Sequence, residues 1–323
     1  MWAMDAGLCP GDGKLLRKLG PQLPQRPMLF HIVHRLTYTY SEPVFLEPIT
    51  LRLTPRQDAS QRLLQHRLTL LPEPAGMSHV LEPDGTDAVI SWFTHTHPVL
   101  TITMETQVET LRTNPFDWIL TDPGVQTLPA TYSAAEAQSL APCLASSGLH
   151  PIVEAWARQR AEAVEWDTAA FLIGLADHIH HTFHHEGRPD GAPFSPSDTL
   201  QQRRGACRDT AMLFTEACRS LGLAARFVSG YSMHHPPEVT EHELHAWAEV
   251  YLPGAGWRGY DPSLGLAVGD GHVVLASAPD HHLAAPVSGS YRGTGVTSRM
   301  DYALMVKAAQ SQAYLEPWDP PLS

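Results

Sequence analysis

A cysteine, a histidine and a carboxylate lie in this order along the second half of the chain, at Cys207, His245 and Asp261. Thiol acyl-transfer enzymes need these three groups: a sulfur nucleophile, an imidazole that moves the proton and a carboxylate that orients the imidazole. A cysteine attacks as its thiolate, so it also needs surroundings that stabilise negative charge. The types and order of these residues therefore indicate a cysteine nucleophile that attacks a carbonyl carbon.

Cys207 lies where a helix is expected to begin. It follows Gly205 closely, and residues 207–221 have the apolar periodicity of an amphipathic helix. In the first turn of a helix, unpaired backbone N–H groups and the positive end of the helix dipole favour an anion such as a thiolate. A lone cysteine is more often an apolar core residue, and Cys218, on the same face of this helix, fits that description. Position at a helix start therefore separates Cys207 from an ordinary buried thiol.

The pattern around His245 predicts a β-hairpin that brings the carboxylate back to the histidine. Residues 243–252 alternate as a strand, residues 253–256 form a turn, and residues 257–260 return as a partner strand that delivers Asp261. Neighbouring residues of a strand point to opposite faces, so a two-residue loop would place Asp261 on the wrong face for His245. A loop with an odd number of residues, or a glycine bulge, places both side chains on one face. We therefore expect an odd loop or a bulge.

Four motifs around these residues resemble those of the bacterial transglutaminase-like superfamily, in particular its transglutaminase-like cysteine peptidases, and they occur in the family's order. The motifs are residues 205–210 (GACRDT), 223–231 (LAARFVSGY), 245–250 (HAWAEV) and 256–263 (GWRGYDPS). Residues 271–274 (GHVV) resemble part of the family's closing region, and the resemblance as a whole covers residues 28–310. Four motifs in the same order make chance agreement implausible.

The resemblance implies a role for each residue that matches the motifs. Cys207 would be the nucleophile, His245 the general acid and base, and Asp261 the carboxylate that orients the imidazole. The backbone N–H of Cys207 would be one donor to the oxyanion of the intermediate. His185 stands where an aromatic residue of the family's upstream motif is usual, and it is the candidate for the second donor. Trp247 is expected to be a core residue first and a wall of the cleft second.

The resemblance also implies the fold class. We expect an α+β, papain-like and transglutaminase-like core, with helices on an antiparallel sheet, preceded by an N-terminal β-sandwich domain of the bacterial transglutaminase-like type. Short alternating segments separated by turn signals between residues 28 and 110 independently favour a β-sandwich. Periodicity also predicts helices over residues 134–140, 151–163 and 168–183 and a last strand over residues 300–308.

The chain is expected to divide into five parts. They are a disordered extension (1–27), the β-sandwich (28–110), a linker (111–149), the transglutaminase-like core (150–310) and a C-terminal tail (311–323). The first part is rich in glycine, proline and charge and has no apolar period, which is typical of disorder. Met28, at the start of the first family-like strand, is the expected biological start.

Composition and charge limit the classes of partner. The 323 residues carry a formal net charge of −12, which argues against nucleic acid or an anionic membrane as the main partner. No apolar run reaches the length of a membrane span, and four cysteines do not make a disulfide framework, so we expect a cytoplasmic location. The 19 histidines include several adjacent pairs, but none has Cys-x-x-Cys or His-Glu-x-x-His spacing. We therefore predict no metal site and no cofactor.

The function predicted from the sequence is cysteine acyl transfer on an amide bond of a peptide or protein substrate through a thioester. If water resolves the thioester the protein is a peptidase or amidase, and if an amine resolves it the protein is a transglutaminase. Hydrolysis is the preferred interpretation, because bacterial proteins of this type are often described as proteases. A different class stays open, in which the fold is retained as a non-catalytic binding or assembly module.

Overall fold

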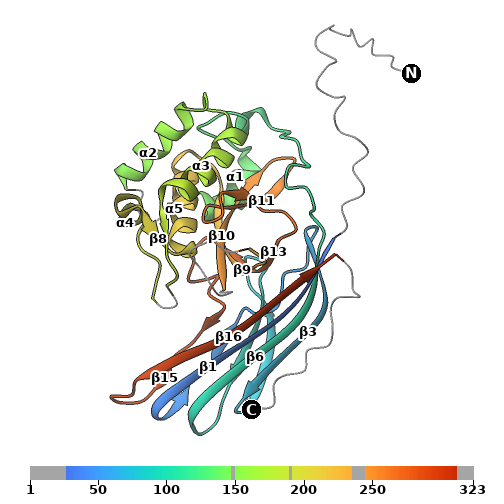
Figure 1. Ribbon diagram of the computed structural model, residues 1–323, viewed down its shortest axis with the longest axis vertical. Coiled ribbons are helices and arrows are strands. Elements are labelled where there is room, and N and C mark those ends of the chain that lie inside the picture. Colours follow the sequence, from blue (N-terminus) through green and yellow to red (C-terminus); the bar gives the residue numbers. More distant parts are fainter. Residues whose placement is uncertain (1–26, 147–149, 189–190, 235–243, 311–323) are drawn as a thin grey trace, which may run out of the picture.

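Alternation of apolar and polar residues places one face of each N-terminal strand in a buried core. The computed structural model describes residues 27–146, 150–188, 191–234 and 244–310. Within these residues, two antiparallel sheets face each other, and inner residues such as Phe30, Leu51 and Ile102 form a shared core (Figure 1). The predicted N-terminal β-sandwich is thereby confirmed. The expected tail (311–323) and all but the last residue of the expected extension lie outside the described residues.

The larger sheet of the sandwich is built around one long strand, β1 (Met28–Leu46). Its other strands are β6 (Thr96–Thr110), β3 (Gln61–Leu71), β15 (Tyr291–Arg292) and β16 (Ser298–Ala309). The smaller sheet has the order β14 (Val287–Ser288), β2 (Ile49–Leu51), β5 (Asp87–Trp92) and β4 (Gly76–Leu81). Strands from both ends of the described chain therefore make up the sandwich.

The strand predicted over residues 300–308 is present as β16, but it does not belong to the core to which we assigned it. β16 pairs with β1 from Leu29↔Ala309 to Tyr40↔Ser298, and β14 pairs with β2 in the smaller sheet. The expected core boundary at residue 310 is therefore wrong, and residues 287–309 complete the sandwich. β16 belongs to the sandwich because its backbone groups pair with those along one edge of β1, a strand far away in the sequence.

Helices pack against a third antiparallel sheet in the middle of the chain, and we call this part the helix–sheet unit (Figure 1). Its sheet has the order β12 (Leu266–Ala267), β11 (Gly256–Asp261), β10 (His245–Leu252), β9 (Ala225–Ser232) and β13 (His272–Ala278). The helices in the described ranges are α1 (Ala134–Leu144), α2 (Pro151–Glu162), α3 (Thr168–Thr182), α4 (Pro196–Gln202) and α5 (Cys207–Ser220), and none could span a membrane. The predicted α+β core and its helices are confirmed.

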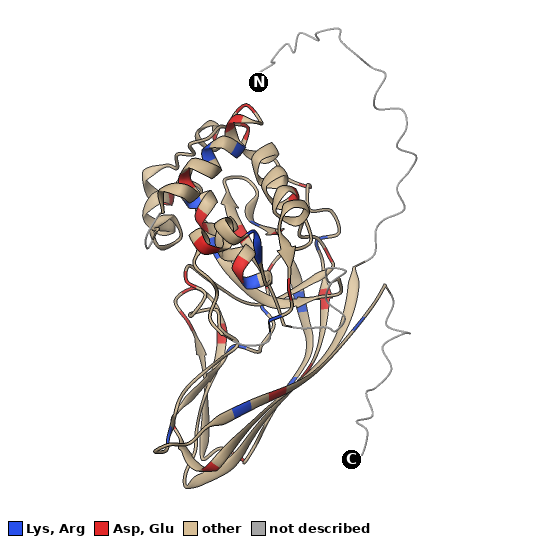
Figure 2. Ribbon diagram, turned by 60° about the vertical axis from the view of Figure 1, so that its left-hand side comes forward, with Lys and Arg blue, Asp and Glu red and all other residues tan. Residues whose placement is uncertain are grey.

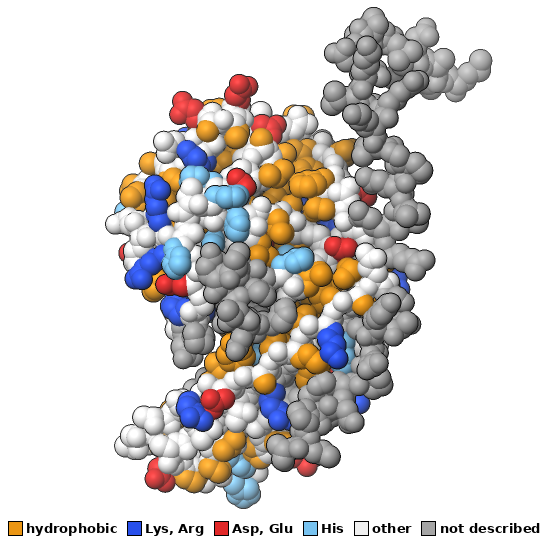
Figure 3. All heavy atoms as spheres, in the orientation of Figure 1, with side chains coloured by type: hydrophobic (Ala, Val, Ile, Leu, Met, Phe, Trp, Pro, Cys, Tyr) orange, Lys and Arg blue, Asp and Glu red, His pale blue; other side chains and the backbone are white. Residues whose placement is uncertain are grey.

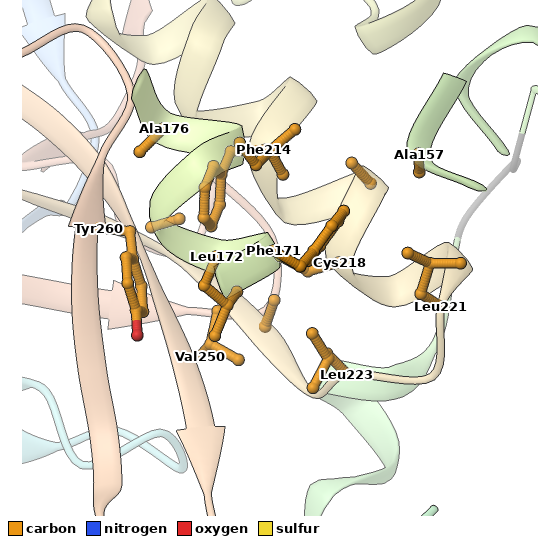
Figure 4. Packing of buried hydrophobic residues seen from close by; sticks show 14 of the residues in the cluster. Ala157, Phe171, Leu172, Ala176, Phe214, Cys218, Leu221, Leu223, Val250 and Tyr260 are labelled. Atoms are coloured by element: carbon orange, nitrogen blue, oxygen red, sulfur yellow. The ribbon is translucent and has the colours of Figure 1, made fainter. Parts of the chain in front are cut away.

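Helix α5 lies at the centre of this unit. Its residues Phe214 and Cys218 are fully buried and point toward Phe171 of α3 and the sheet residues Val250 and Tyr260 (Figure 4). The rings of Phe214 and Tyr260 stack with their centroids 5.8 Å apart. Burial raises the pKa of the Cys218 thiol well above its ordinary value, so this cysteine is the unreactive filler expected from the sequence.

The segment expected to be a linker is packed against the helix–sheet unit in its described part. It contains the short 3₁₀ helix η1 (Pro123–Val125) and α1, and Val125, Leu128 and Ala130 are buried in the same core as α5. The backbone N–H of Ala130 donates to the carbonyl of Leu221 at 2.8 Å, just beyond α5. The segment therefore covers one side of the core as it crosses between the two units.

A buried ion network joins the sandwich to the helix–sheet unit. Glu249 of β10 accepts hydrogen bonds from Arg56, beyond β2, at 2.8 and 3.1 Å, and from Arg226 of β9 at 2.9 Å. Burial opposes the charge of Glu249, but the two arginines outweigh it and hold its pKa well below the ordinary value. Other acidic and basic residues are interspersed over the helix–sheet unit (Figure 2). This network fixes the two units against each other.

Gln61 makes a second polar connection between the units, at an irregularity in β13. The pairing of β13 with β9 shifts between Val274 and Ala276. There the side-chain amide of Gln61 donates to the Val274 carbonyl (2.9 Å) and accepts from the Val274 N–H (2.8 Å). Gln61 therefore supplies backbone-like hydrogen bonds to β13 from the sandwich.

The buried network predicts a large stability change when Glu249 loses its charge. The substitution Glu249→Gln removes the carboxylate shared by Arg56 and Arg226, which leaves Arg56 paired with Asp58, and we expect the free energy of unfolding to fall by about 3–5 kcal/mol. Glu73→Gln, at an exposed position, is the control and should change it by less than about 0.5 kcal/mol. Urea denaturation measures both, and equal small changes would contradict the role given to the network.

Candidate active site

The start of α5 is shaped by Asp209, the third residue of the helix. The extended backbone of Ala206 precedes Cys207, and the Asp209 carboxylate accepts a hydrogen bond from the Ala206 N–H at 2.7 Å. A Cβ on Gly205 would lie 2.7 Å from the Asp209 Cβ, so only glycine fits there. Cys207 is thereby held at the first helical position, where a backbone N–H has no partner within the helix.

The charge of Asp209 is balanced by Arg188, which approaches from beyond α3. The guanidinium donates to both carboxylate oxygens at 2.6 and 2.8 Å and stacks over the Phe194 ring, 4.1 Å from its centroid. The backbone N–H of Phe194 also donates to Asp209 at 2.7 Å. A fully buried carboxylate is thus paired, and the two partners are fixed beside the start of α5.

The hairpin of β10 and β11 has a three-residue loop, so the predicted odd loop is confirmed. Leu252 pairs with Gly256, which leaves residues 253–255 in the turn. Gly254 has a φ of +88°, and a Cβ at this position would lie 2.6 Å from the Ile119 carbonyl oxygen. This register places His245 and Asp261 on one face of the sheet.

The structure brings together the three residues singled out first from the sequence. His245 Nε2 donates to Asp261 Oδ2 at 2.6 Å, and the Cys207 side chain is hydrogen-bonded to His245. Since Nε2 faces the carboxylate, the ring nitrogen available to the sulfur is Nδ1. Burial lowers the pKa of His245, but the charge of Asp261 and the hydrogen bonds to Asp261 and Cys207 outweigh burial and raise it to about 10. The histidine is therefore an imidazolium at neutral pH.

Asp261 is fully buried and accepts five hydrogen bonds. Oδ1 accepts from the Ser263 N–H (3.0 Å), the Ser263 hydroxyl (2.7 Å) and the Leu264 N–H (3.2 Å), and Oδ2 accepts from two histidines. Burial opposes its charge, but His245 and the hydrogen bonds outweigh it and hold the pKa of Asp261 far below the ordinary value. The carboxylate therefore stays ionised, with both oxygens fixed in position.

The second histidine on Asp261 is His272 of β13, which the analysis of the sequence did not assign to the site. Its Nε2 lies 3.0 Å from Asp261 Oδ2, and its ring packs edge-on against Trp247 with centroids 5.0 Å apart. Burial lowers the pKa of His272, so it donates to Asp261 as a neutral imidazole. The only sequence signal was its place in the family-like segment 271–274.

Trp247 and His185 are the other two site residues suggested by the sequence, and both are buried. Trp247 is fully buried, packs with Val228 and Val274 and lies 6.0 Å from the His245 ring, so it supports the site from the core and is not a cleft wall. His185 is buried in a short strand, β7 (His184–His185), that pairs with β8 (Arg204–Gly205) just before Cys207. Its ring stacks on His180 at 5.7 Å.

A cavity of about 490 Å³ opens onto Cys207 and His245 between the two units. One side is formed by residues of the helix–sheet unit such as Phe227 and Ala246, and the other by β1 and β16 of the sandwich. His185 and Trp247 are not among its described lining residues. In the space-filling view, hydrophobic side chains gather where the helix–sheet unit meets the long strands (Figure 3).

Two groups of described side chains have the residue types of metal ligands. In the first, His245 and His272 are both committed to hydrogen bonds with Asp261. In the second, Asp280 already accepts a hydrogen bond from the backbone of His282, and His281 lies beside both. The prediction that the protein needs no metal remains a prediction.

Comparison with known proteins agrees with this fold. Residues 154–262 match the family model of the transglutaminase-like superfamily, and residues 30–109 match that of the bacterial transglutaminase-like N-terminal region. These matches confirm the resemblance that the four motifs indicated, and one falls in each of the two units described above.

Similar proteins include both bacterial relatives and a solved structure. An uncharacterised protein of Mycobacterium tuberculosis is 28% identical over 298 residues, which are 88% of this chain and 94% of the relative. One from Mycobacterium leprae is 26% identical over 292 residues, covering 82% and 94%. The crystal structure of a candidate cysteine protease from Cytophaga hutchinsonii has a TM-score of 0.65 at 21% identity and covers 88% of this chain and 90% of that one. This likeness shows a shared fold.

The raised pKa of His245 predicts a pH-dependent contribution to stability. Because about 10 lies above the ordinary value of 6.5, the ion pair with Asp261 contributes fully below about pH 6.5 and is lost as the pH rises toward 10. We expect the difference in unfolding free energy between the wild-type protein and Asp261→Asn to shrink over that interval. Urea denaturation at several pH values measures it, and a difference independent of pH would contradict the ion pair.

The two donors on Asp261 Oδ2 predict that His272 influences His245. The substitution His272→Phe removes one donor, so more of the carboxylate charge acts on His245, and we expect the pKa of His245 to rise further. His272→Gln can still donate and should stay closer to the wild-type value. NMR titration of histidine-labelled protein, with His245→Gln to assign the signal, measures the pKa. An unchanged value in His272→Phe would remove this role from His272.

Proposed function

We propose that this protein is a cysteine acyl-transfer enzyme acting on amide bonds of peptides or proteins. The premise is that the chain is a transglutaminase-like superfamily protein with the bacterial transglutaminase-like N-terminal region. The observation that carries the proposal is the continuous chain of hydrogen bonds from Cys207 through His245 to a buried Asp261, placed at the edge of a cavity. An imidazolium beside a cysteine stabilises the thiolate, which is the nucleophilic form.

In the first step, Cys207 Sγ attacks the carbonyl carbon and forms the S–C bond, and the carbonyl oxygen takes up negative charge. The backbone N–H of Cys207 would donate to this oxyanion; His185, the second donor suggested by the sequence, is not among the described lining residues of the cavity and would have to reach the oxyanion to act. His245 gives its proton to the departing nitrogen, the C–N bond breaks, and the amine leaves. Asp261 keeps the ring oriented and stabilises its positive charge while it holds the proton.

In the second step, the thioester is resolved by a nucleophile that His245, now neutral, deprotonates. Water gives a carboxylic acid and restores the thiolate and imidazolium, so the protein would be a peptidase or amidase. A primary amine gives a new amide instead, so the protein would be a transglutaminase. Hydrolysis is the preferred form of the proposal, and the two differ only in the nucleophile that reaches the thioester.

Alkylation by iodoacetamide tests the nucleophile without a known substrate. We expect Cys207 to react rapidly well below the free-thiol pKa of about 8.5, and His245→Ala to slow this reaction. Cys218, buried in the core of the same helix, is the internal control and should stay unlabelled in the folded protein. Peptide mass spectrometry resolves the two sites. Labelling of Cys207 no faster than an ordinary thiol and unaffected by His245→Ala would favour a non-catalytic binding module.

Incubation with a peptide library, with and without a fluorescent primary amine, tests the reaction. We expect new carboxyl termini or deamidated products, detected by mass spectrometry, that disappear with Cys207→Ala and form about 10²–10⁴-fold more slowly with His245→Ala. Dominant incorporation of the amine would replace hydrolysis by transglutamination. No Cys207-dependent product of either kind would contradict the proposed activity on peptides.

A further inference from the structure

The wall of the cavity opposite Cys207 comes from the sandwich. His34, Leu36 and Tyr38 of β1 line it together with Met300 and Tyr302 of β16. In the register of these strands Leu36 pairs with Tyr302 and Tyr38 with Met300, so all of them project from one face of the sheet. This face of the sandwich therefore lies across the cavity from the nucleophile.

Nearer the start of β1, the same face of the sandwich packs tightly against the helix–sheet unit. There Phe30 and Ile32 are fully buried in one cluster with Val273 and Leu275 of β13. At the boundary, His34 Nδ1 is hydrogen-bonded to the hydroxyl of the fully buried Tyr231 at 2.9 Å. Burial lowers the pKa of His34 to about 4, so this side chain is neutral at physiological pH. The cavity begins where the tight packing of the two units ends.

The described residues that line the cavity include no aspartate or glutamate. Arg188 is held by Asp209 through two hydrogen bonds, and the Ser229 hydroxyl donates to the Ala284 carbonyl at 2.6 Å. Leu244 and Phe227 continue the apolar surface on the side of the nucleophile. Arg208, His281 and His282 also line the cavity, but on the side away from β1 and β16. The described residues of β1 and β16 in the lining carry no charge, so this wall suits an apolar group, because a charged group would lose its hydration against it without gaining a partner there.

We infer that the sandwich face formed by Leu36, Tyr38, Met300 and Tyr302 is a specificity pocket, and that it selects peptides with a bulky apolar side chain next to the carbonyl that Cys207 attacks. The inference rests on the proposed function. The acyl side is assigned because its carbonyl carbon bonds to Cys207 Sγ, and so its side chain remains in the cavity through both steps. The sandwich would thus take part in choosing the substrate.

A panel of peptide acyloxymethyl ketones that differ only in the residue next to the reactive group tests this pocket on the unaltered protein. Rates of Cys207 labelling are read by intact mass spectrometry. We expect phenylalanine and leucine probes to react at least about tenfold faster than alanine, aspartate or lysine probes. Equal rates for all probes would overturn the inference.

Substitutions on β16 test whether the preference for apolar probes comes from the sandwich face. Met300→Gln keeps the volume and adds polarity, and we expect it to slow the phenylalanine probe by about tenfold while iodoacetamide labelling stays unchanged. Met305→Gln, on the same strand but the opposite face, pairs with Val33 and is the matched control. Equal effects of the two substitutions on the phenylalanine probe would also overturn the pocket.

The two proposals fail in distinguishable ways. If iodoacetamide labels Cys207 in a His245-dependent manner but the peptide probes show no preference, the nucleophile stands and the pocket is refuted. If no reagent labels Cys207 in a His245-dependent manner, the proposed function itself fails, and the pocket fails with it.

Discussion

The buried charge of Asp261 is the constraint around which the candidate active site is organised. A carboxylate removed from water is stable only when it is paired and fully hydrogen-bonded. Its five donors come from β10, from β13 and from the turn that follows β11. Asp261 is therefore fully hydrogen-bonded only when three features are correct together: the hairpin register, the position of β13 and the conformation of that turn. His245 and His272 are fixed by the same requirement, and this fixes the imidazole that faces Cys207.

A second constraint acts between the two units. Arg56, beyond β2, binds Glu249, and Gln61, the first residue of β3, binds Val274, both in the helix–sheet unit. The apolar residues at the start of β1 complete the contact. These contacts fix the positions of the two units, and the cavity lies between them. Its shape is consequently a property of both units, so a change in the sandwich can alter the surroundings of the cysteine without touching it.

Local sequence was sufficient to predict the parts of the site that depend on short-range geometry. The helix start at Cys207 followed from periodicity and a glycine, and the odd hairpin loop followed from the requirement that His245 and Asp261 share a face. The role of His272 could not be derived in this way, because its strand pairs with β9, about 40 residues earlier, and nothing local indicates that it reaches Asp261. Trp247, by contrast, is buried as the sequence predicted, and β9 and β13 supply the residues that pack against it.

The fold class was predicted correctly, and the pairing of the last strand was missed for the same reason. Several of the longer strands and helices were predicted from their periodicity, and β16 was among them. Its partner was not, since pairing with β1 joins residues from opposite ends of the described chain. Edge pairing of this kind depends on which backbone groups remain unpaired once the other strands are in place, and this information is absent from any short window of sequence.

The pairing of β16 with β1 also sets an order of events during synthesis on the ribosome. β1 emerges early, and the entire helix–sheet unit is made before β16 is available to cover its edge. Through that interval β1 has an unpaired edge that can pair with other chains, so a chaperone or a provisional partner has most to protect there. Helix α5 with Cys207 is likewise made before Met300 and Tyr302. A nascent chain would therefore carry Cys207 for a time without the wall of the cavity that faces it.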